Sequence, residues 1–285
     1  MGNKFKVAVC WSGQMRTHNE ELVIYDDVIN GRVIKTNAVY NPDSTVDIFA
    51  NNSTTEKTNI FKVIDDLRHY DFEVDHYGHT WADCELPVNK HKFKSLIHED
   101  QIVIDEWVDE NSDNRKVRGG TLDARGSYGQ TWSGFRAYGL VEGDYNAVIR
   151  IRWDVLCYST KELSIWIRHL IFDQGDTHRD RTLNEKLSVP TEYYRTPVTW
   201  TSMKKGHSIL NIDHITDVFW ISNTTAFKLW KETDFKKKLH EVVTMCHNMT
   251  MDRLTPHSHR LWNLMQPETI HCIGYLPENF CEIKR

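Results

Sequence analysis

The chain has 285 residues, of which 40% are hydrophobic and 26% are charged, a size that allows one large domain with a substantial buried core. Its 35 lysines and arginines stand against 40 acidic residues, and the resulting net charge of −5 excludes a uniformly basic coat for nucleic acid but leaves room for a local basic face. No apolar run approaches the roughly 20 residues needed to span a membrane, and the run at 7–11 is too short for a signal-peptide core.

The cysteines indicate a reducing compartment. All six are scattered and none forms a Cys-x-x-Cys pair, so neither a zinc ribbon nor a dense disulfide framework is expected. Cys10 and Cys157 lie in or beside apolar runs, which is typical of buried free thiols. We therefore expect the protein in the cytoplasm, or in the host cytoplasm if the chain is viral.

The first half of the chain alternates strand patterns with helical patterns. Apolar runs predict strands at 4–11, 46–50, 75–81, 101–107 and 146–154, and helical spacing predicts helices at 19–28, 58–69 and 128–141. Between them, the polar stretch 109–127 is rich in Gly, Asp, Asn and Arg, and we interpret it as a mobile loop over a site.

The second half of the chain is less regular. Mixed helix and strand character marks 161–172, and 173–210 shows no clear organisation. Further along, the pattern predicts a strand at 218–222, an amphipathic helix at 225–245 with a basic patch at 236–238, a short helix at 256–265 and a last strand at 269–276.

The alternation predicts an α/β fold: a mostly parallel central sheet, Rossmann-like, with helices on both faces. Ligands of such sheets bind at the carboxyl ends of the strands, near the point where the strand order reverses. Three polar groups fall at predicted carboxyl ends: Ser12-Gly13-Gln14, His79-Thr80-Trp81 and Asp154. We expect them to meet at one edge of the sheet.

The stretch Arg150-Ile151-Arg152-Trp153-Asp154 is the most informative part of the chain. At the period of two of a strand, its three polar residues share one face. A carboxylate at a strand end can hold a divalent metal, and guanidinium groups can bind phosphate, which together suit a nucleoside-diphosphate site. The alternative is a partly exposed edge strand with an Arg–Asp ion pair.

Taken in order, three motifs resemble viral and bacterial glycosyltransferases of the GT-A type. They are the Ser-Gly-Gln-x-Arg turn at 12–16, the strand that ends in His-Thr-Trp at 79–81, and Arg-x-Arg-x-Asp at 150–154. The resemblance covers residues 5–155, and residues 215–222 resemble the family more weakly. Where that family typically has Asp-x-Asp, this chain has Arg152-Trp153-Asp154, with one carboxylate.

This resemblance implies a hexosyl- or pentosyltransferase that moves a sugar from a nucleoside-diphosphate sugar, such as a UDP-sugar, to a hydroxyl acceptor with the help of Mn or Mg. Residues 1–160 would be the nucleotide-sugar-binding α/β half, and 161–285 the acceptor-side half of the same compact domain. In the donor site, Asp154 would bind the metal, which acts as a Lewis acid on the leaving diphosphate.

Several residues are candidates for the donor site. The opening turn would cradle the nucleotide with its backbone N–H groups and the charge of Arg16, although a simple strand-to-helix turn has the same sequence. His79 and Thr80 would line the donor pocket, whereas Trp81 suits the core at least as well. Gln130 would bind a sugar hydroxyl, with capping or packing as its alternative. The full set of donor-site candidates is Ser12, Gly13, Gln14, Arg16, His79, Thr80, Gln130, Arg150 and Arg152.

Inversion of the anomeric centre would require a base that deprotonates the acceptor hydroxyl. Asp217 is the first candidate and Asp213 the second, and each is also a plausible turn residue. His257, His259 and His271 are further candidates for a third metal ligand.

Two acceptor classes and two other functions stay open. One acceptor is a glycan or lipid-linked sugar, and the other is hydroxymethylcytosine in phage DNA, which requires base flipping and for which the basic runs at 90–94, 115–118 and 204–205 could meet phosphates. A non-catalytic nucleotide or nucleic-acid binding module is the alternative to an enzyme. A nucleotidyl or phosphoryl transferase is a weaker option, and the chain has no P-loop motif.

Overall fold

A computed structural model describes these residues of the chain: 4–15, 22–27, 32–34, 53–58, 60–102, 124–157, 160–172, 198–202, 219–239, 241, 271–276 and 281–283. The strands are β1 (Phe5–Ser12), β2 (Leu22–Asp27), β3 (Arg32–Ile34), β4 (Ser53–Thr58), β5 (Phe72–Trp81), β6 (Phe93–Glu99), β7 (Ala147–Arg152), β8 (Val155–Cys157), β9 (Val198–Ser202), β10 (Phe219–Asn223), β11 (His271–Leu276) and β12 (Cys281–Ile283). The helices are α1 (Ile60–Asp65), α3 (Ala124–Gly139), α4 (Thr160–Phe172) and α5 (Thr224–Glu232), with short 3-10 helices η1 (Asp66–Tyr70) and η2 (Lys90–Lys92).

The main sheet has seven strands in the order β11-β9-β10-β7-β1-β5-β6. The neighbours β7, β1, β5 and β6 all pair in parallel, as do β9 and β11. Only β10 runs against its neighbours β7 and β9. The expectation of a mostly parallel sheet is therefore confirmed, and strands from both halves of the sequence contribute to it.

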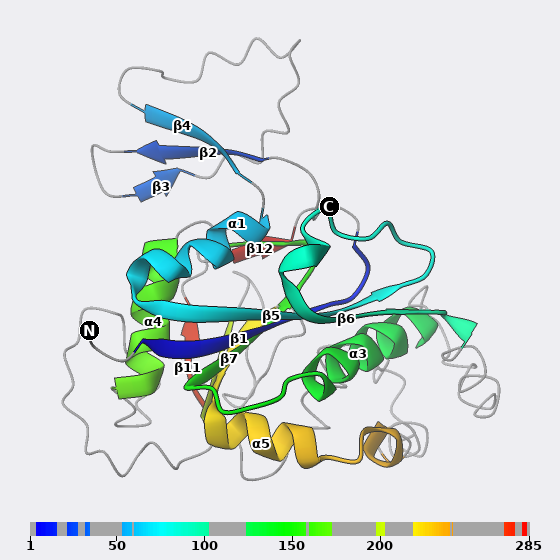
Figure 1. The fold of residues 1–285 in the computed structure, drawn as a ribbon. Coiled ribbons are helices and arrows are strands. Elements are labelled where there is room, and N and C mark those ends of the chain that lie inside the picture. Colours follow the sequence, from blue (N-terminus) through cyan, green and yellow to red (C-terminus); the bar gives the residue numbers. More distant parts are fainter. Residues whose placement is uncertain are drawn as a thin grey trace, which may run out of the picture.

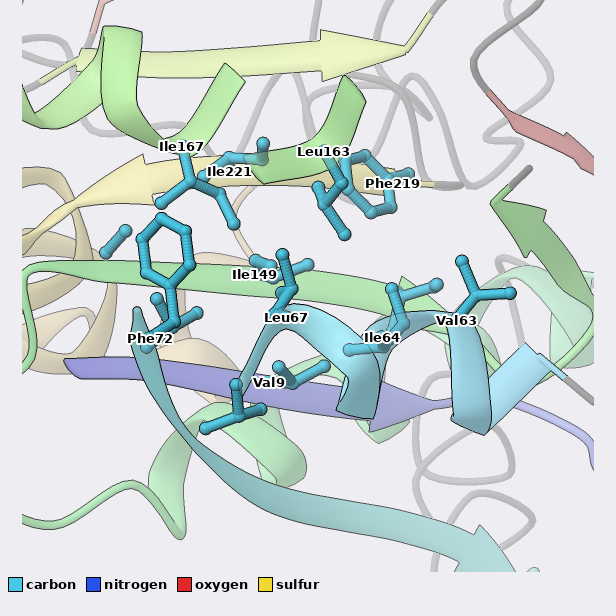
Figure 2. Packing of buried hydrophobic residues seen from close by; sticks show 14 of the residues in the cluster. Val9, Val63, Ile64, Leu67, Phe72, Ile149, Leu163, Ile167, Phe219 and Ile221 are labelled. Carbon is cyan, nitrogen blue, oxygen red and sulfur yellow. The ribbon is translucent and has the colours of Figure 1, made fainter. Parts of the chain in front are cut away.

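Helices cover both faces of this sheet, as the alternating pattern of its strands predicts. Along β1, Val7 and Val9 pack with α1, η1 and α4 in one buried apolar cluster, whereas Ala8 and Cys10 pack with α3 and α5 in another. Figure 2 shows Val9 within the first cluster, with Ile64, Leu67 and Leu163. Figure 1 shows α3 and α5 on the side of the sheet away from α1. The two clusters bury a large apolar area, which is the main favourable term in the stability of such a fold.

The strand order reverses between β1 and β7. From β1 the chain passes to β5 and then β6 on one side of β1, and it returns to β7 on the other side. In the register of these strands, Ser12 pairs with Arg152 and Cys10 with Arg150. Ser12 and Arg152 are the last residues of their strands, so the switch point lies at the carboxyl edge between them.

One predicted helix is wrong, another is only partly confirmed, and one predicted strand is not confirmed where it can be described. The predicted helix at 19–28 contains β2, which pairs with β3 and β4 in a separate three-stranded sheet beyond α1 (Figure 1). Its sequence Leu-Val-Ile-Tyr is rich in the branched and aromatic residues that strands prefer, and a partner strand about 30 residues away decides the outcome. The predicted helix at 225–245 breaks after Glu232, where Thr233 is extended. Of the strand predicted at 101–107, Gln101 and Ile102 are not in a strand and 103–107 lie outside the described residues, whereas an unpredicted strand, β6, lies at 93–99.

Other predicted elements are confirmed or fall outside the description. The strands at 4–11 and 75–81 and the helix at 128–141 are present with shifted bounds, and the mixed segment 161–172 is the helix α4. The strand predicted at 46–50 and the helix predicted at 256–265 lie outside the described residues. Among the described residues, no helix is both long and apolar enough to cross a bilayer.

Gly78 lies where β5 meets the aromatic residues of its neighbours. A Cβ atom at this position would lie 2.7 Å from Leu96 Cδ1, 3.0 Å from Phe93 Cε1 and 3.1 Å from Trp153 Cη2. Real side chains do not approach so closely, so only glycine fits without a shift of its surroundings. This close approach explains the first residue of the Gly-His-Thr-Trp motif without any ligand.

Candidate active site at the carboxyl edge of the sheet

The opening turn and the tip of the Arg-x-Arg-x-Asp segment lie side by side. Beyond the paired residues Ser12 and Arg152, the backbone N–H of Trp153 donates a hydrogen bond to the Ser12 carbonyl at 3.2 Å. The indole N–H of Trp153 also donates to the carbonyl oxygen of His79 at 2.8 Å. The ends of β1, β5 and β7 are therefore joined at the switch point, where three polar motifs from distant parts of the sequence meet.

Gly13 gives the opening turn its shape. Its φ angle of +97° is in the left-handed region, which glycine adopts without the steric cost that a Cβ brings. No described atom lies within 4 Å of where such a Cβ would be, so the turn has open space on that side. Its N–H donates to the Ser133 Oγ of α3 at 2.6 Å. The expected approach of this N–H to a phosphate does not match the structure, because the N–H is already engaged.

The neighbours of Gly13 in the turn differ in exposure. Ser12 is fully buried, and its hydroxyl has no hydrogen-bond partner among the described residues. Gln14 is exposed, and Met15 is buried. Arg16 lies outside the described residues. The donor-site roles of Ser12, Gln14 and Arg16 therefore stay predictions.

Arg152 and Asp154 form a two-pronged ion pair. Arg152 Nε donates to Asp154 Oδ1 at 2.8 Å, and Nη2 donates to Oδ2 at 2.6 Å. Asp154 is buried, whereas the Arg152 side chain keeps about a fifth of its surface exposed. The ion pair that was the alternative interpretation of this stretch is thus present. It holds a guanidinium group at the switch point, beside Ser12.

The described residues do not provide a site for a divalent metal ion. Both carboxylate oxygens of Asp154 accept hydrogen bonds from Arg152. In the described part of the chain, no three His, Cys, Asp or Glu side chains gather as metal ligands. His271 begins β11, three strand positions from β7 and at the amino end of a strand parallel to it, so it does not complete a site at Asp154. The metal role of Asp154 stays a prediction.

Arg150 lies inside the core rather than at the edge. The side chain is fully buried, and its guanidinium group lies 4.9 Å from the ring centre of Trp220, in a cation–π contact. The adjacent Cys10 thiol is also fully buried, which raises its pKa. Arg150 therefore packs within the α3 and α5 side of the molecule, and Arg152 is the arginine that reaches the switch point.

His79 lies in a buried chain of hydrogen bonds. Its Nδ1 is 2.8 Å from Ser133 Oγ, and its Nε2 is 2.8 Å from Glu99 Oε2. Burial lowers the pKa of His79, only partly offset by Glu99, so the ring is neutral near pH 7. A carboxylate can only accept, so Nε2 carries the proton and Nδ1 accepts from the Ser133 hydroxyl. His79 is thus satisfied by protein groups rather than facing a donor pocket.

Glu99 is the last residue of β6, and one of its carboxylate oxygens accepts three hydrogen bonds. Besides His79, the Trp132 indole N–H at 2.9 Å and Arg136 Nε at 3.2 Å donate to Glu99 Oε2. Burial alone would raise the pKa of Glu99, but the hydrogen bonds from His79 and Trp132 and the Arg136 charge lower it to about 2. The guanidinium group of Arg136 also lies 5.9 Å from the Trp132 ring centre. Glu99 is therefore ionised at neutral pH.

The order Ser133, His79, Glu99 matches the connectivity of a nucleophile, base and carboxylate. A nucleophilic serine must reach a substrate, however, and Ser133 is fully buried. Its oxygen also accepts the Gly13 N–H. This geometry excludes covalent catalysis by Ser133 and leaves a role in holding the turn.

The remaining donor-site and base candidates differ in burial and in position, and two of them lie outside the described residues. Thr80 is fully buried, with no hydrogen-bond partner for its hydroxyl among the described residues. Trp81 is buried and meets His79 edge to face at 4.8 Å, which matches its interpretation as core. Gln130 lies within α3, which already begins at Ala124, so Gln130 is not at the helix N-terminus as expected. Asp213 and Asp217 lie outside the described residues.

Ser133 and Glu99 are the residues that sequence reasoning missed. Glu99 is the last residue of β6, a strand whose pattern the basic run at 90–94 obscures, and its place at the carboxyl end would have been the signal. Ser133 is three residues after Gln130 on α3, so the two lie near each other on the helix surface. A small polar residue within a helix is a weak signal that only the tertiary contacts make specific.

Comparison with solved structures gives distant matches. The galactosyltransferase LgtC, in complex with donor and acceptor sugar analogs, matches with 10% identity and a TM-score of 0.38, over 75% of this chain and 66% of that enzyme. Mouse xyloside xylosyltransferase 1, in its apo form, matches with 9% identity and a TM-score of 0.34, over 70% of this chain and 72% of that protein. No protein-family model and no curated protein matches the chain. The likeness is too distant to assign the chain to a family.

Proposed function

We propose that the protein is a glycosyltransferase that transfers a sugar from a nucleoside-diphosphate sugar to a hydroxyl acceptor. One observation carries the proposal: the Ser12–Gly13 turn and the Arg152–Asp154 pair meet at the point where the strand order of a parallel sheet reverses. Open α/β sheets bind their ligands at this point. A fixed guanidinium group beside a glycine turn that has open space on its Cβ side suits a diphosphate.

Arg152 supplies the positive charge in this proposal. The pair with Asp154 holds the guanidinium group through Nε and Nη2, and about a fifth of the side chain surface is exposed. Asp154 fixes the plane of the group, so that Arg152 can bind oxygen atoms of the diphosphate in a defined orientation. The same charge stabilises the negative charge that develops on the leaving nucleoside diphosphate. Arg16 is the proposed second cation, from the opening turn.

Asp217 is the proposed base, with Asp213 as the alternative. Strand β10 begins at the carboxyl edge of β7, because its first residue Phe219 pairs with Ile151. Asp217 stands two residues before Phe219 in the sequence, outside the described residues. A carboxylate contributed next to the start of β10 would suit removal of the acceptor proton during an inverting transfer.

The proposed acceptor is a hydroxyl group on a glycan or lipid-linked sugar. Hydroxymethylcytosine in phage DNA, with a UDP-sugar as donor, is the alternative. Residues 1–160 hold the donor side and 161–285 the acceptor side in this proposal. Incubating the enzyme with a UDP-sugar and either oligosaccharides or hydroxymethylated DNA, and measuring the gain in mass of each, separates the two acceptors.

A nucleotide-sugar screen tests the donor site. UDP-, GDP- and dTDP-sugars are added to the purified protein with Mn, with Mg and with a chelator, and the unfolding temperature and sugar release are recorded. A ligand present at a hundred times its Kd stabilises the folded state by about 2.7 kcal/mol. Stabilisation without turnover under any condition would indicate a non-catalytic nucleotide-binding module instead.

Variants of Arg152 test the charge at the switch point. Arg152→Ala is expected to raise the Kd of the best nucleotide by about tenfold or more, because a hydrogen bond to a charged group contributes about 1.5–3 kcal/mol. Arg152→Lys keeps the charge but loses the planar fork, and its Kd is expected to lie between those of wild type and Arg152→Ala. Lys228→Ala, at an exposed pair with Asp144, is the control. Unchanged affinity in Arg152→Ala would remove Arg152 from the site.

A further inference from the structure

We propose that Glu99, His79 and Ser133 act as a relay of positioning residues that holds the Gly13 turn in its nucleotide-binding conformation, an inference that rests on the proposed nucleotide-sugar site. None of the three is expected to touch the nucleotide. Ser133 and His79 are fully buried, and Glu99 reaches the surface only in part. Their effect on binding passes through the Gly13 backbone.

The direction of every hydrogen bond in the relay is fixed. Gly13 N–H can only donate, so Ser133 Oγ accepts it at 2.6 Å and must direct its own proton elsewhere. The Ser133 proton goes to His79 Nδ1 at 2.8 Å, which leaves the ring proton on Nε2 for Glu99 at 2.8 Å. Because each link sets the polarity of the next, the loss of Glu99 as an acceptor removes the preference for the tautomer that Ser133 needs.

The relay joins four separate elements of the fold. Gly13 follows β1, Ser133 is on α3, His79 is on β5 and Glu99 ends β6. The Trp132 and Arg136 donors come from the same helix as Ser133 and meet the same Glu99 oxygen. The turn is thereby tied to a helix and to two further strands at the carboxyl edge.

The conformation of the Gly13 turn is the property that the loss of a relay hydrogen bond is expected to change most. Glycine reaches φ +97° without steric cost and reaches other φ angles as easily, so the residue itself does not hold this conformation, and no described atom packs within 4 Å of the Cβ direction of Gly13. Besides the Trp153 N–H that donates to the Ser12 carbonyl of the same peptide, the hydrogen bond to Ser133 is therefore the contact that orients this peptide. Without it the competent conformation is a smaller fraction of the ensemble, and the apparent Kd rises in inverse proportion.

His76 offers a matched control on the same strand. It is also fully buried and also lies between a nitrogen donor and a carboxylate, with Trp11 Nε1 at 3.1 Å and Asp65 Oδ1 at 3.3 Å. Its chain ends at an indole in the apolar core rather than at a backbone N–H of the turn. A purely structural effect of a lost buried histidine is therefore measured at His76.

The test compares Ser133→Ala, Glu99→Ala and Glu99→Gln with wild type and with His76→Gln. UDP is titrated into each folded protein by calorimetry, and the exchange rate of the Gly13 amide is measured by NMR without ligand. For Ser133→Ala and Glu99→Ala we expect a Kd about tenfold higher and faster Gly13 exchange, with an unchanged exchange rate at Val9 in the middle of β1. Glu99→Gln keeps an oxygen acceptor for His79 and is expected to keep the affinity of wild type.

The outcomes separate the relay from the proposed function. Wild-type affinity and exchange in both alanine variants would overturn the relay, as would an equal rise in Kd for His76→Gln. If wild type binds neither UDP nor any nucleotide-sugar, the proposed function fails, and the Gly13 exchange rates alone then decide whether the relay holds the turn. If Ser133→Ala does not fold, the pair Glu99→Ala and Glu99→Gln gives the same comparison at the more exposed end of the relay.

Discussion

Strand β5 carries two buried histidines on opposite faces of the sheet. The two rings have chemically similar hydrogen-bond partners, but these partners belong to different parts of the molecule. His76 Nδ1 accepts the indole N–H of Trp11, and Nε2 faces Asp65 on the α1 side. His79 Nδ1 accepts the Ser133 hydroxyl, and Nε2 faces Glu99 on the α3 side. In both cases a carboxylate fixes the tautomer of a neutral ring.

Electrostatics are also similar on the two sides. Burial lowers the pKa of both histidines, with partial compensation from the facing carboxylates. Burial would raise the pKa of Asp65, but the hydrogen bonds from His76 and Lys92 and the charge of Arg68 lower it below its ordinary value, much as the Glu99 partners do. The difference lies at the other end of each chain: an indole in the apolar core for His76, and the turn at the switch point for His79. A histidine–carboxylate pair therefore does not define a role by itself.

The largest expected effect that separates the two sides comes from removing each ring. His76→Ala and His79→Ala are each expected to lower the free energy of unfolding by about 3 kcal/mol, because each leaves a cavity and an unpaired buried donor or acceptor. Only His79→Ala is expected to weaken UDP binding. Urea unfolding and UDP titration of both variants test this. A loss of UDP affinity in His76→Ala equal to that in His79→Ala would abolish the distinction.

Gly78 lies between the two histidines and tests whether the strand that carries them can shift. Gly78→Ala is expected to lower the free energy of unfolding by about 1–3 kcal/mol, since its Cβ would lie 2.7 Å from Leu96 Cδ1. Gly139→Ala is the control, because nothing described lies within 4 Å of that Cβ. Equal stability of the two variants in urea would mean that β5 adapts easily at this point.

The two neutral rings also predict how stability depends on pH. Their folded pKa values lie below the ordinary value of about 6.5, so below that pH the unfolded chain binds protons that the folded chain does not. The free energy of unfolding is therefore expected to fall as pH falls from 6.5, by up to about 1.4 kcal/mol per pH unit for each ring. Urea midpoints from pH 8 to 5 measure this, and His76→Gln and His79→Gln should each reduce the slope. A flat profile in wild type would contradict the buried neutral state of both rings.

The smallest effects are expected at the exposed ends of the two chains. Lys92 meets Asp65 at 2.9 Å and Arg136 meets Glu99 at 3.2 Å, and both cations are about 42% exposed. Exposed pairs contribute little, so Lys92→Ala and Arg136→Ala are each expected to change the free energy of unfolding by less than about 1 kcal/mol. Losses well above that, measured by urea unfolding, would show that the cations rather than the histidines hold the carboxylates.

The sequence alone predicted the central elements of the fold. Apolar alternation located β1, β5 and β7, helical spacing located α1 and α3, and their order predicted a mostly parallel sheet with helices on both faces. The same rules placed Ser12 and Asp154 at the carboxyl edge, because parallel strands end on the same side. The Arg152–Asp154 pair was also within reach of the sequence, since residues two positions apart stay within about 7.6 Å of each other, Cα to Cα, in any tertiary arrangement.

Tertiary structure decided what local pattern could not. Whether 22–27 is helix or strand depended on pairing with β4, a segment far along the chain. The burial of Arg150 depended on its contact with Trp220, which belongs to strand β10 in the second half of the sequence. The contacts of His79 join residues 54 and 20 positions apart, and no sequence spacing encodes such a meeting. Sequence patterns report the period of a segment and its ends, whereas the partner of a buried polar group is decided only when separate elements pack together.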